Sequence, residues 1–316
     1  MTNWQRLWRW TAVTCTLALL AFVGVAWFVA GALVAPANRQ VGPAPGGYGI
    51  ESVTIRSDSG SGLAAWYIPR HGATATVVLF HPIRSDRRAM LGRAKLFHHA
   101  GYATLLVDLQ AHGESPGENI TAGYRERLDV SAAVNFVRTR HPAHRIGIVG
   151  WSLGGAAALL GSPLKIDALA LESVYPTLQE AVHNRISLRM GMLSHILTPT
   201  LLVQLQPRLG ISPSQLCPID HIQDVGCPLL IAAGDCDDHT TLSETQRLYQ
   251  TAPEPKQLVI FEGAAHTDLL TYDPDKYHRI VAFFDRYLTD KGRATEGGIM
   301  VTEQRAGHRA VDDGEF

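Results

Sequence analysis

The fold is decided by the stretch Arg145-Ile-Gly-Ile-Val-Gly-Trp-Ser152-Leu-Gly-Gly-Ala-Ala-Ala-Leu-Leu160. Its first half is a short apolar run with β-branched residues, which predicts a buried strand. Its second half is rich in alanine and leucine, which favours a helix. The pentapeptide G-x-S-x-G lies between them at 150–154. The stretch therefore predicts a strand, a sharp turn at Ser152 and a helix.

This turn has the chemistry that a nucleophile needs. A strand-to-helix turn of this kind holds the serine in a strained conformation and lifts its hydroxyl clear of the sheet, and a side chain at Gly150 or Gly154 would crowd it. The helix after Ser152 presents free N–H groups and a positive dipole end where an oxyanion would form. A chance match in a glycine-rich chain is the alternative, and the flanking strand and helix argue against it.

Strands and helices alternate through the rest of the chain. Residues 50–56 and 63–68 predict an antiparallel hairpin around a Ser/Gly turn. Buried strands are expected at 76–80, 103–107, 166–171, 229–233 and 256–261, and helices at 86–99, 125–140, 241–249 and 277–288. This order predicts an α/β fold, a mostly parallel sheet flanked by helices. The active site of such a sheet lies at the carboxyl ends of its strands.

The N-terminus predicts a membrane anchor. Residues 11–34 carry no charge and are long enough to cross a bilayer, with Arg6 and Arg9 before them and Arg39 after. We therefore expect a cytoplasmic stub and a single transmembrane helix at 1–35, with the catalytic domain on the extracytoplasmic side. A cleaved signal peptide is the alternative, since Ala30-Gly-Ala32 resembles a cleavage site, but its apolar region would normally be shorter.

Composition divides the rest of the chain. Residues 36–47 predict a Pro/Gly linker, residues 48–290 the catalytic domain, and the polar, glycine-rich residues 291–316 a disordered tail. Residues 176–216 interrupt the alternation because they are rich in leucine and contain Pro199, Pro207 and Pro213. We expect short amphipathic helices there that form a lid insertion. The alternative is that these leucines pack on the domain core.

The composition argues against several kinds of partner. The formal net charge is −1 and no dense run of Lys or Arg occurs, so we expect no nucleic-acid partner. The four cysteines are widely spaced and match no zinc pattern, so we expect neither a metal nor a cofactor. Cys217 and Cys227 could form a disulfide in an oxidising compartment.

These residues resemble the α/β-hydrolase family over about residues 48–288. The resemblance depends on Gly150-Trp-Ser-Leu-Gly-Gly155, the Gly234-x-x-Asp237 turn and Gly263-Ala-Ala-His266, which keep the family's order of nucleophile, acid and histidine. The chain looks most similar to serine aminopeptidase S33-type and monoacylglycerol-lipase-type hydrolases and to related membrane-anchored proteins. The resemblance implies a serine hydrolase with a catalytic triad.

Three residues are the expected triad. Ser152 is the nucleophile, and His266 is the base that removes the proton from its hydroxyl. Asp237 is the acid that orients the imidazole and stabilises the imidazolium. The alternatives for the acid are Asp235, Asp238 and, at the end of the strand 166–171, Glu172.

Two backbone N–H groups are expected to form the oxyanion hole. Leu153, directly after the nucleophile, supplies one. The family's second donor usually follows a His-Gly pair, and this chain has His81-Pro82 at that place, so Ile83 takes the donor position. Proline fixes φ and has no N–H, which restricts this loop without removing the expected donor.

Other residues near these strand ends are candidates for binding. Arg84 and Trp151 are candidate substrate-binding residues. Arg84 would bind an anionic group, although a solvated arginine is the simpler interpretation. His81 and His112 also follow strands, and hydrogen bonds to neighbouring loops explain them without a catalytic role.

The sequence therefore predicts a membrane-anchored serine hydrolase that cleaves a carboxylic ester through an acyl-enzyme. The leucine-rich insertion and the anchor favour a small-molecule or lipid substrate with a lipophilic acyl group, with thioesters and amides as alternatives. A serine aminopeptidase or an acyltransferase would use the same triad. A non-catalytic binding protein of this fold is the remaining alternative, and the intact order of the three residues argues against it.

Overall fold

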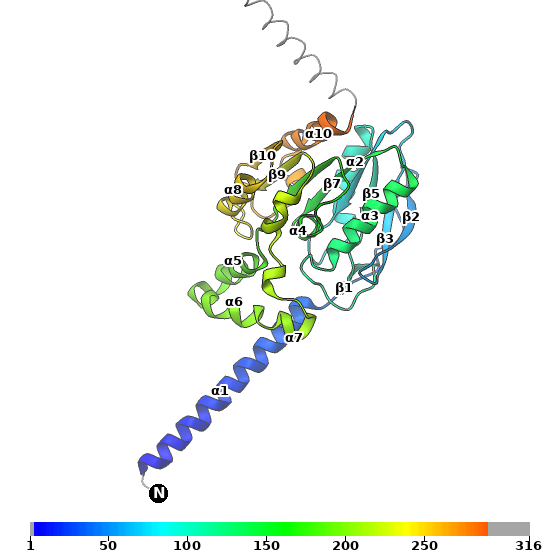
Figure 1. Cartoon of the computed structure of the whole chain (residues 1–316). Coiled ribbons are helices and arrows are strands. Elements are labelled where there is room, and N and C mark those ends of the chain that lie inside the picture. The colour runs from blue at the N-terminus through cyan, green and yellow to red at the C-terminus, as the bar shows by residue number, and fades with distance from the viewer. Residues whose placement is uncertain (1–2, 290–316) are drawn as a thin grey trace, which may run out of the picture.

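A mostly parallel sheet organises the computed structural model, which describes residues 3–289 (Figure 1). Its strands are β2 (Glu51–Arg56), β3 (Gly62–Ile68), β4 (Ala75–Phe80), β5 (Ala103–Val107), β7 (Arg145–Trp151), β8 (Ala168–Glu172), β9 (Leu229–Gly234) and β10 (Lys256–Phe261). Their order across the sheet is β10-β9-β8-β7-β4-β5-β3-β2. All neighbours from β10 to β5 are parallel, whereas β3 is antiparallel to both β5 and β2.

The burial of the strands explains their composition. Strands β4, β5, β8 and β9 are buried along their whole length, as expected for parallel strands that helices cover on both faces. Strand β2 alternates in burial and lies at the edge of the sheet, which agrees with the predicted hairpin. The predicted fold class is therefore confirmed.

Two helical layers cover the sheet (Figure 1). Helices α2 (Leu91–His99) and α10 (Pro274–Leu288) pack on one face, where the Phe97 and Phe284 rings meet edge to face at 5.2 Å. Helices α3 (Glu126–Arg140), α4 (Leu153–Leu160) and α8 (Leu242–Thr251) pack on the other face. Asp86 caps a short 3-10 helix, η1 (Arg87–Met90), before α2 begins. The short helix α9 (Leu269–Tyr272) precedes α10.

Residues 176–216 form a separate group of short helices. They are α5 (Leu178–Met190), η2 (Gly191–Leu193), α6 (Ser194–Leu202), α7 (Leu205–Leu209) and η3 (Pro213–Gln215), and η4 (Pro218–Asp224) follows them. Their buried leucines Leu202, Leu205 and Leu216 form a small cluster with Leu160 at the end of α4. This cluster is distinct from the two large ones on the sheet faces, so these leucines pack on one end of the domain and not within its main core.

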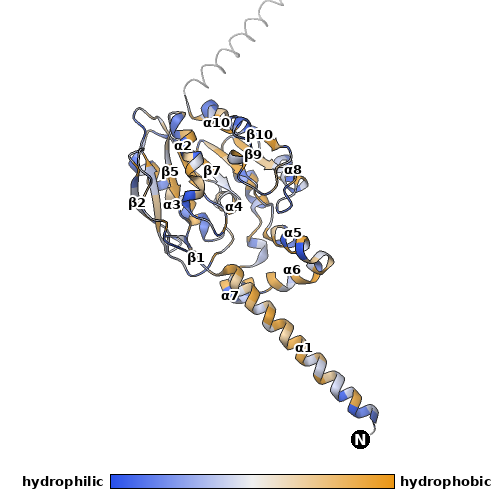
Figure 2. Cartoon of the chain, turned by 180° about the vertical axis from the view of Figure 1, so that it is seen from behind, coloured by the Kyte–Doolittle hydropathy of each residue, from blue (hydrophilic) through white to orange (hydrophobic). Residues whose placement is uncertain are grey.

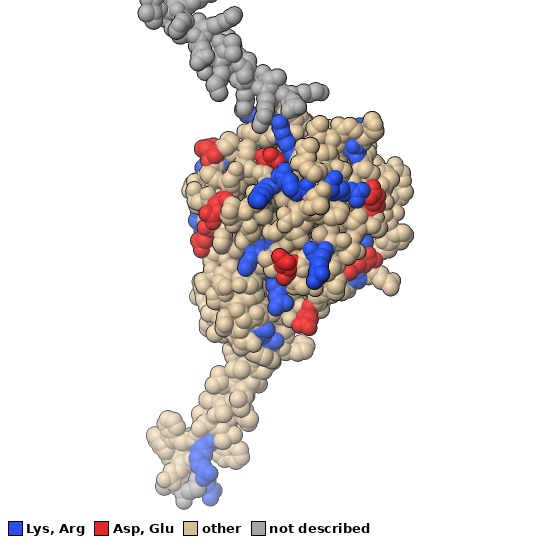
Figure 3. Space-filling view, turned by 45° about the vertical axis from the view of Figure 1, so that its right-hand side comes forward, with Lys and Arg blue, Asp and Glu red and all other residues tan. Residues whose placement is uncertain are grey.

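Helix α1 (Asn3–Val34) extends away from the domain (Figures 1 and 2). It contains an 18-residue window with a mean hydropathy of 2.5, and Ala26 and Ala30 are its only buried residues. Figure 3 shows an uncharged stretch along α1 between the arginines near its N-terminus and the domain. By length and composition, α1 can span a membrane.

The segment 36–47 differs from the expected linker. Its two-residue strand β1 (Ala37–Asn38) pairs in parallel with β6 (His112–Gly113), and Val41 is buried. The N–H groups of Val41 and Gly42 donate to a Glu114 carboxylate oxygen at 3.0 and 3.3 Å. The chain leaving α1 is therefore held against the domain.

Two further expectations concern the cysteines and the C-terminus. The four cysteines are free thiols, including Cys217 and Cys227. The predicted disordered tail 291–316 lies outside the described residues.

Candidate active site

Ser152 occupies the sharp turn between β7 and α4. Its φ of 50° and ψ of −108° lie in a region that non-glycine residues rarely adopt. Its N–H donates to the Glu172 carbonyl at 2.8 Å, which attaches the turn to the neighbouring strand β8. Only 1% of the residue is exposed, so the serine lies at a closed site at the carboxyl end of the sheet.

The glycines around Ser152 are required by close packing. A Cβ at Gly150 would lie 2.5 Å from Gly155 Cα, and a Cβ at Gly154 would lie 2.6 Å from the Phe80 carbonyl oxygen. A Cβ at Gly155 would lie 2.7 Å from the Gly150 carbonyl oxygen. Backbone atoms cannot move aside at these distances. The three glycines therefore let α4 begin directly against β7 and β4.

Asp237 and His266 form a hydrogen-bonded pair. His266 Nδ1 lies 2.7 Å from Asp237 Oδ2, and the Asp237 side chain is fully buried while 16% of the His266 side chain is exposed. The other Asp237 oxygen accepts from the N–H groups of His239 and Thr240, each at 2.8 Å. These two donors hold the carboxylate, which in turn holds the His266 proton on Nδ1 and leaves Nε2 free to accept one.

The alternative acids have other partners. Asp235 Oδ1 accepts from the Gly263 N–H at 2.6 Å, so Asp235 fastens the loop that carries His266. Asp238 is exposed. Glu172 is fully buried, where it pairs with Arg93 Nη2 at 2.5 Å and accepts from the Tyr277 hydroxyl. Of the four candidates, only Asp237 is bonded to His266 among the described residues.

His81 and His112 hold loops, as the simpler interpretation expects. His81 Nδ1 bonds the Pro82 carbonyl at 2.8 Å, and its Nε2 accepts from the Leu109 N–H at 3.1 Å. Burial lowers the pKa of His81 to about 3, so the ring is neutral and connects the loop after β4 to the loop after β5. His112 Nδ1 bonds the Gln110 carbonyl at 2.9 Å.

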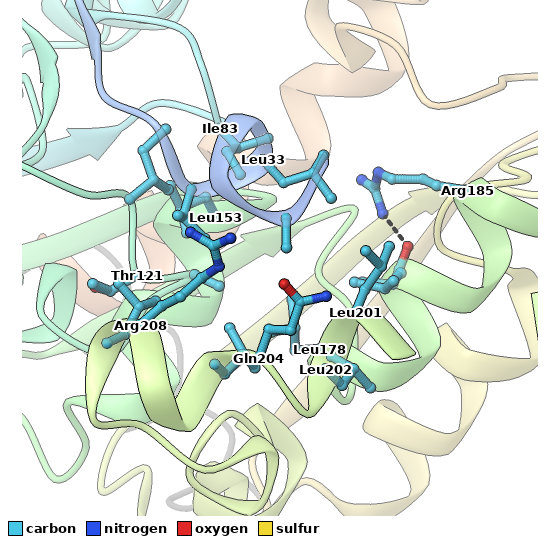
Figure 4. A pocket seen from close by; sticks show the side chains of 18 of the residues that line it. Leu33, Ile83, Thr121, Leu153, Leu178, Arg185, Leu201, Leu202, Gln204 and Arg208 are labelled. Atoms are coloured by element: carbon cyan, nitrogen blue, oxygen red, sulfur yellow. Dashed lines mark hydrogen bonds between the residues drawn. The ribbon is translucent and has the colours of Figure 1, made fainter. Parts of the chain in front are cut away.

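Ser152 opens into an apolar pocket with a volume of about 160 Å³ (Figure 4). Leu153 and Ile83, the expected oxyanion donors, line it beside Ser152. Most of the other lining residues are apolar side chains of α5, α6, α7 and α1, among them Leu178, Leu201, Leu202, Leu205 and Leu33. Arg185 and Arg208 also line the pocket, and none of the described lining residues is Asp or Glu.

The two residues expected to bind substrate lie elsewhere. The Arg84 guanidinium donates to the carbonyls of Ala32, Leu33 and Ala35 at the end of α1. The Trp151 ring lies under the Arg93 guanidinium, 4.8 Å from it. Neither residue lines the pocket. Strand-end position places a residue at the correct edge of the sheet but does not fix the direction of its side chain.

Arg185 is the basic group that sequence reasoning missed. It projects from α5 to the rim of the pocket, where it donates to the Ala181 carbonyl at 2.8 Å (Figure 4). No carboxylate of the described residues forms an ion pair with it, and burial lowers its pKa. The neighbouring Asn184 donates to Glu244 Oε1 of α8 at 2.8 Å and to the His239 carbonyl at 3.3 Å, and the second bond ties α5 to the loop that carries Asp237. The only sequence signal was that Arg185 is one of three arginines in the leucine-rich residues 176–216.

The sequence of this chain is similar to a known protein family and to several known proteins. Residues 71–217 match the family model of serine aminopeptidase S33. The protein Rv2307c of Mycobacterium tuberculosis is 30% identical over 242 residues, which cover 72% of this chain and 78% of that protein. The membrane protein YNL320W of Saccharomyces cerevisiae is 23% identical over 264 residues, which cover 81% of this chain and 85% of that protein.

Solved structures share the fold. The esterase Pf2001 of Pyrococcus furiosus superposes with a TM-score of 0.66 at 23% sequence identity, covering 81% of this chain and all of that one. At this identity, the likeness supports the fold and not a particular activity.

Proposed function

Because the chain belongs to the α/β-hydrolase superfamily, we propose that it is a membrane-anchored serine hydrolase that cleaves carboxylic esters of lipophilic acyl groups. The observation that carries the proposal is the strained Ser152 opening into an apolar pocket. The hydrogen-bonded Asp237–His266 pair supports it, since both residues follow strands whose carboxyl ends lie on the same edge as Ser152.

The mechanism follows from these positions. His266 Nε2 takes the proton of the Ser152 hydroxyl as its oxygen attacks the ester carbonyl, and Asp237 stabilises the imidazolium that forms. The N–H groups of Leu153 and Ile83 would bind the oxyanion. His266 then gives its proton to the departing alkoxide, which leaves as the alcohol. Water, deprotonated by His266, then attacks the acyl-enzyme. His266 returns this proton to the Ser152 oxygen as the carboxylic acid leaves, which restores the free serine.

The charge of the pocket favours an ester over the amino-terminal peptide that an aminopeptidase binds. An α-ammonium group needs an acidic partner, but the charged residues among the described pocket lining are Arg185 and Arg208. Arg185, in place of Arg84, would bind an anionic group of the substrate. The apolar walls would hold the acyl chain.

The position at a membrane is supported by α1 and by the yeast relative, which is named a membrane protein. Trp10 and Trp27 lie about 25 Å apart along α1 at about 1.5 Å per residue, which suits the two interfaces of a bilayer. Arg6 and Arg9 precede the apolar run, and by the positive-inside rule this charge bias supports an N-terminus in the cytoplasm and a catalytic domain outside.

The test is Ser152-dependent turnover by the full chain in lipid nanodiscs. Wild type and Ser152→Ala would be compared on p-nitrophenyl acetate, butyrate, octanoate and dodecanoate, on aminoacyl p-nitroanilides, and with a fluorophosphonate probe. We expect probe labelling and ester cleavage by wild type, with a loss of about 10⁴-fold or more in Ser152→Ala. Faster cleavage of the anilides would favour the peptidase. An unlabelled and inactive but folded wild type would favour the non-catalytic binding protein.

A further inference from the structure

We infer that the end of α1 is a wall of the acyl pocket, so that the membrane anchor forms part of the binding site and the acyl chain enters along it from the bilayer. The inference rests on the proposed function. Its first observation is that Ala30, Leu33 and Val34 line the pocket that contains Ser152. Figure 4 shows Leu33 next to Ile83, on the side of the pocket opposite Leu202. These residues belong to the apolar helix and not to the domain.

The end of α1 is fixed in this place by polar contacts along its last turns. The Ile120 N–H donates to the Val34 carbonyl at 2.8 Å, and Arg84 binds the carbonyls that end the helix. Gln204 Nε2 donates to the Ala26 carbonyl at 3.2 Å. The Arg208 guanidinium lies 3.7 Å from the Trp27 ring centroid. Four residues therefore hold the end of α1, and two of them, Gln204 and Arg208, belong to residues 176–216.

Small residues allow this close approach. Ala26 and Ala30 are four residues apart, lie on one face of α1 and are buried, with Gln204 bonded to the Ala26 carbonyl and Ala30 lining the pocket. A Cβ at Gly31 would lie 3.2 Å from Arg208 Nη1. Every residue of α1 before Ala26 is exposed, so the contact with the domain is confined to residues 26–34, which include the three that line the pocket. A helix that served only as a tether would need no such fit.

The pocket lies just above the expected bilayer surface. If Trp27 marks the outer interface, Leu33 is about 9 Å farther along the helix at about 1.5 Å per residue. An acyl chain moving along α1 would travel only this distance to reach the pocket wall. The substrate is therefore an ester whose acyl chain resides in the outer leaflet and is partly withdrawn from it.

The exposed surface of the helices beside α1 also suits a position at the bilayer boundary. Exposed apolar side chains gather on α5, η2 and α6 and just after α6, namely Leu188, Met190, Met192, Leu193, Ile196 and Val203. Residues 181–219 contain three arginines and no Asp or Glu. An apolar and basic surface beside α1 suits the boundary of an anionic bilayer. The mouth of the pocket would then face lipid and not bulk water.

The inference is tested by making the pocket smaller with a larger side chain on its α1 wall. Leu33→Trp places a larger side chain on the pocket, and Leu19→Trp makes the same change on α1 at a residue that does not line it. Leu33 and Leu19 are 50% and 61% exposed, so both changes are made at accessible positions. We expect Leu33→Trp to lower the octanoate-to-acetate ratio of kcat/KM by about tenfold or more, and Leu19→Trp to leave that ratio unchanged.

Leu33→Ala gives the opposite test, because it widens the pocket and should shift the preference toward dodecanoate. All chains would be assayed in nanodiscs, and fluorophosphonate labelling of Ser152 would confirm that each is folded. A Leu33→Trp profile equal to that of wild type, with normal labelling, overturns the inference alone. A wild type without Ser152-dependent turnover overturns the proposed function and this inference with it.

Discussion

At the residue scale, the buried carboxylates Asp237 and Glu172 have different environments. Asp237 is held by two backbone N–H groups and faces His266, whereas Glu172 neutralises the buried Arg93. We expect Asp237→Asn to lower kcat by about 10⁴-fold with little change in the apparent Tm, because the imidazole loses its correct tautomer.

Glu172→Gln is the contrasting change. It removes the buried carboxylate that pairs with Arg93 and leaves Asp268, 3.1 Å from Arg93 Nη1, as the remaining anionic partner. The buried guanidinium is then only partly compensated, which costs up to about 3–5 kcal/mol of stability, so the apparent Tm should fall. Esterase kinetics and thermal unfolding in the same nanodiscs separate the two effects. The assignment of the acid is wrong if Asp237→Asn keeps its turnover. Asp238→Asn, an exposed neighbour, serves as the control.

The second prediction at this scale concerns Arg185 and its preference for anionic substrates. Arg185→Gln should lower kcat/KM for esters that carry a carboxylate or phosphate by about tenfold, which corresponds to the loss of about 1.4 kcal/mol, and should spare neutral esters. Arg189→Gln, one turn farther along α5 and exposed, should change neither value. Equal losses on charged and neutral esters would show that Arg185 has only a structural role.

His81 makes the stability of the domain depend on pH. Its folded-state pKa of about 3 is below the ordinary value of 6.5, so the folded state binds fewer protons than the unfolded state between these values. Stability is therefore fully present above pH 6.5 and falls as the pH drops toward 3, by up to about 1.4 kcal/mol per pH unit.

The measurement is the apparent Tm against pH for wild type and His81→Gln. We expect the apparent Tm of His81→Gln to fall less steeply than that of wild type as the pH drops below 6.5. His71→Gln, at an exposed turn, should keep the wild-type slope. The slope that remains in His81→Gln would come from other groups of lowered pKa, among them His112, whose pKa burial lowers, and Asp86, in which burial that raises the pKa is outweighed by hydrogen bonds with Arg88 that lower it. An unchanged slope in His81→Gln would contradict the prediction.

At the element scale, the join between β7 and α4 limits which residues can follow the serine. Gly154→Ala would bring a Cβ to 2.6 Å from the Phe80 carbonyl oxygen, and strand β4 cannot yield there. We expect a loss of about 1–3 kcal/mol in stability together with slower fluorophosphonate labelling. Gly46→Ala, where nothing lies within 4 Å of the added Cβ, should leave both measurements near wild type.

The sequence pattern predicts some of the strands and helices and not others. Six strands, β4, β5, β7, β8, β9 and β10, could be predicted because each has a mostly apolar run between turn residues, and the periodicity of α10 marked its buried face. Strand β1 could not be predicted, since two residues in a Pro/Gly segment carry no periodicity. Its pairing depends on the shape of the loop that contains His112 and Gly113, which only the folded domain presents.

At the scale of the whole molecule, the orientation in the membrane can be measured with Cys236. This thiol is exposed near the active-site edge, whereas Cys15 lies within α1. A membrane-impermeant maleimide should label Cys236 in intact cells if the domain is extracytoplasmic. Asp235 raises the pKa of this thiol, so mildly alkaline buffer is needed. Cys236→Ser should abolish that labelling, and labelling that requires permeabilised cells would place the domain in the cytoplasm.

The sequence by itself determined the sheet, the turn at Ser152 and the Gly-x-x-Asp and Gly-x-x-His segments, because these depend on local periodicity and on residues close together in the chain. Only the tertiary structure decided which acid pairs with His266, and it moved Arg84 from the pocket to the end of α1. It also brought Leu33 and Leu202, more than 160 residues apart in the sequence, to the same pocket. Such contacts depend on the path of the whole chain and on side-chain direction, which no local pattern encodes.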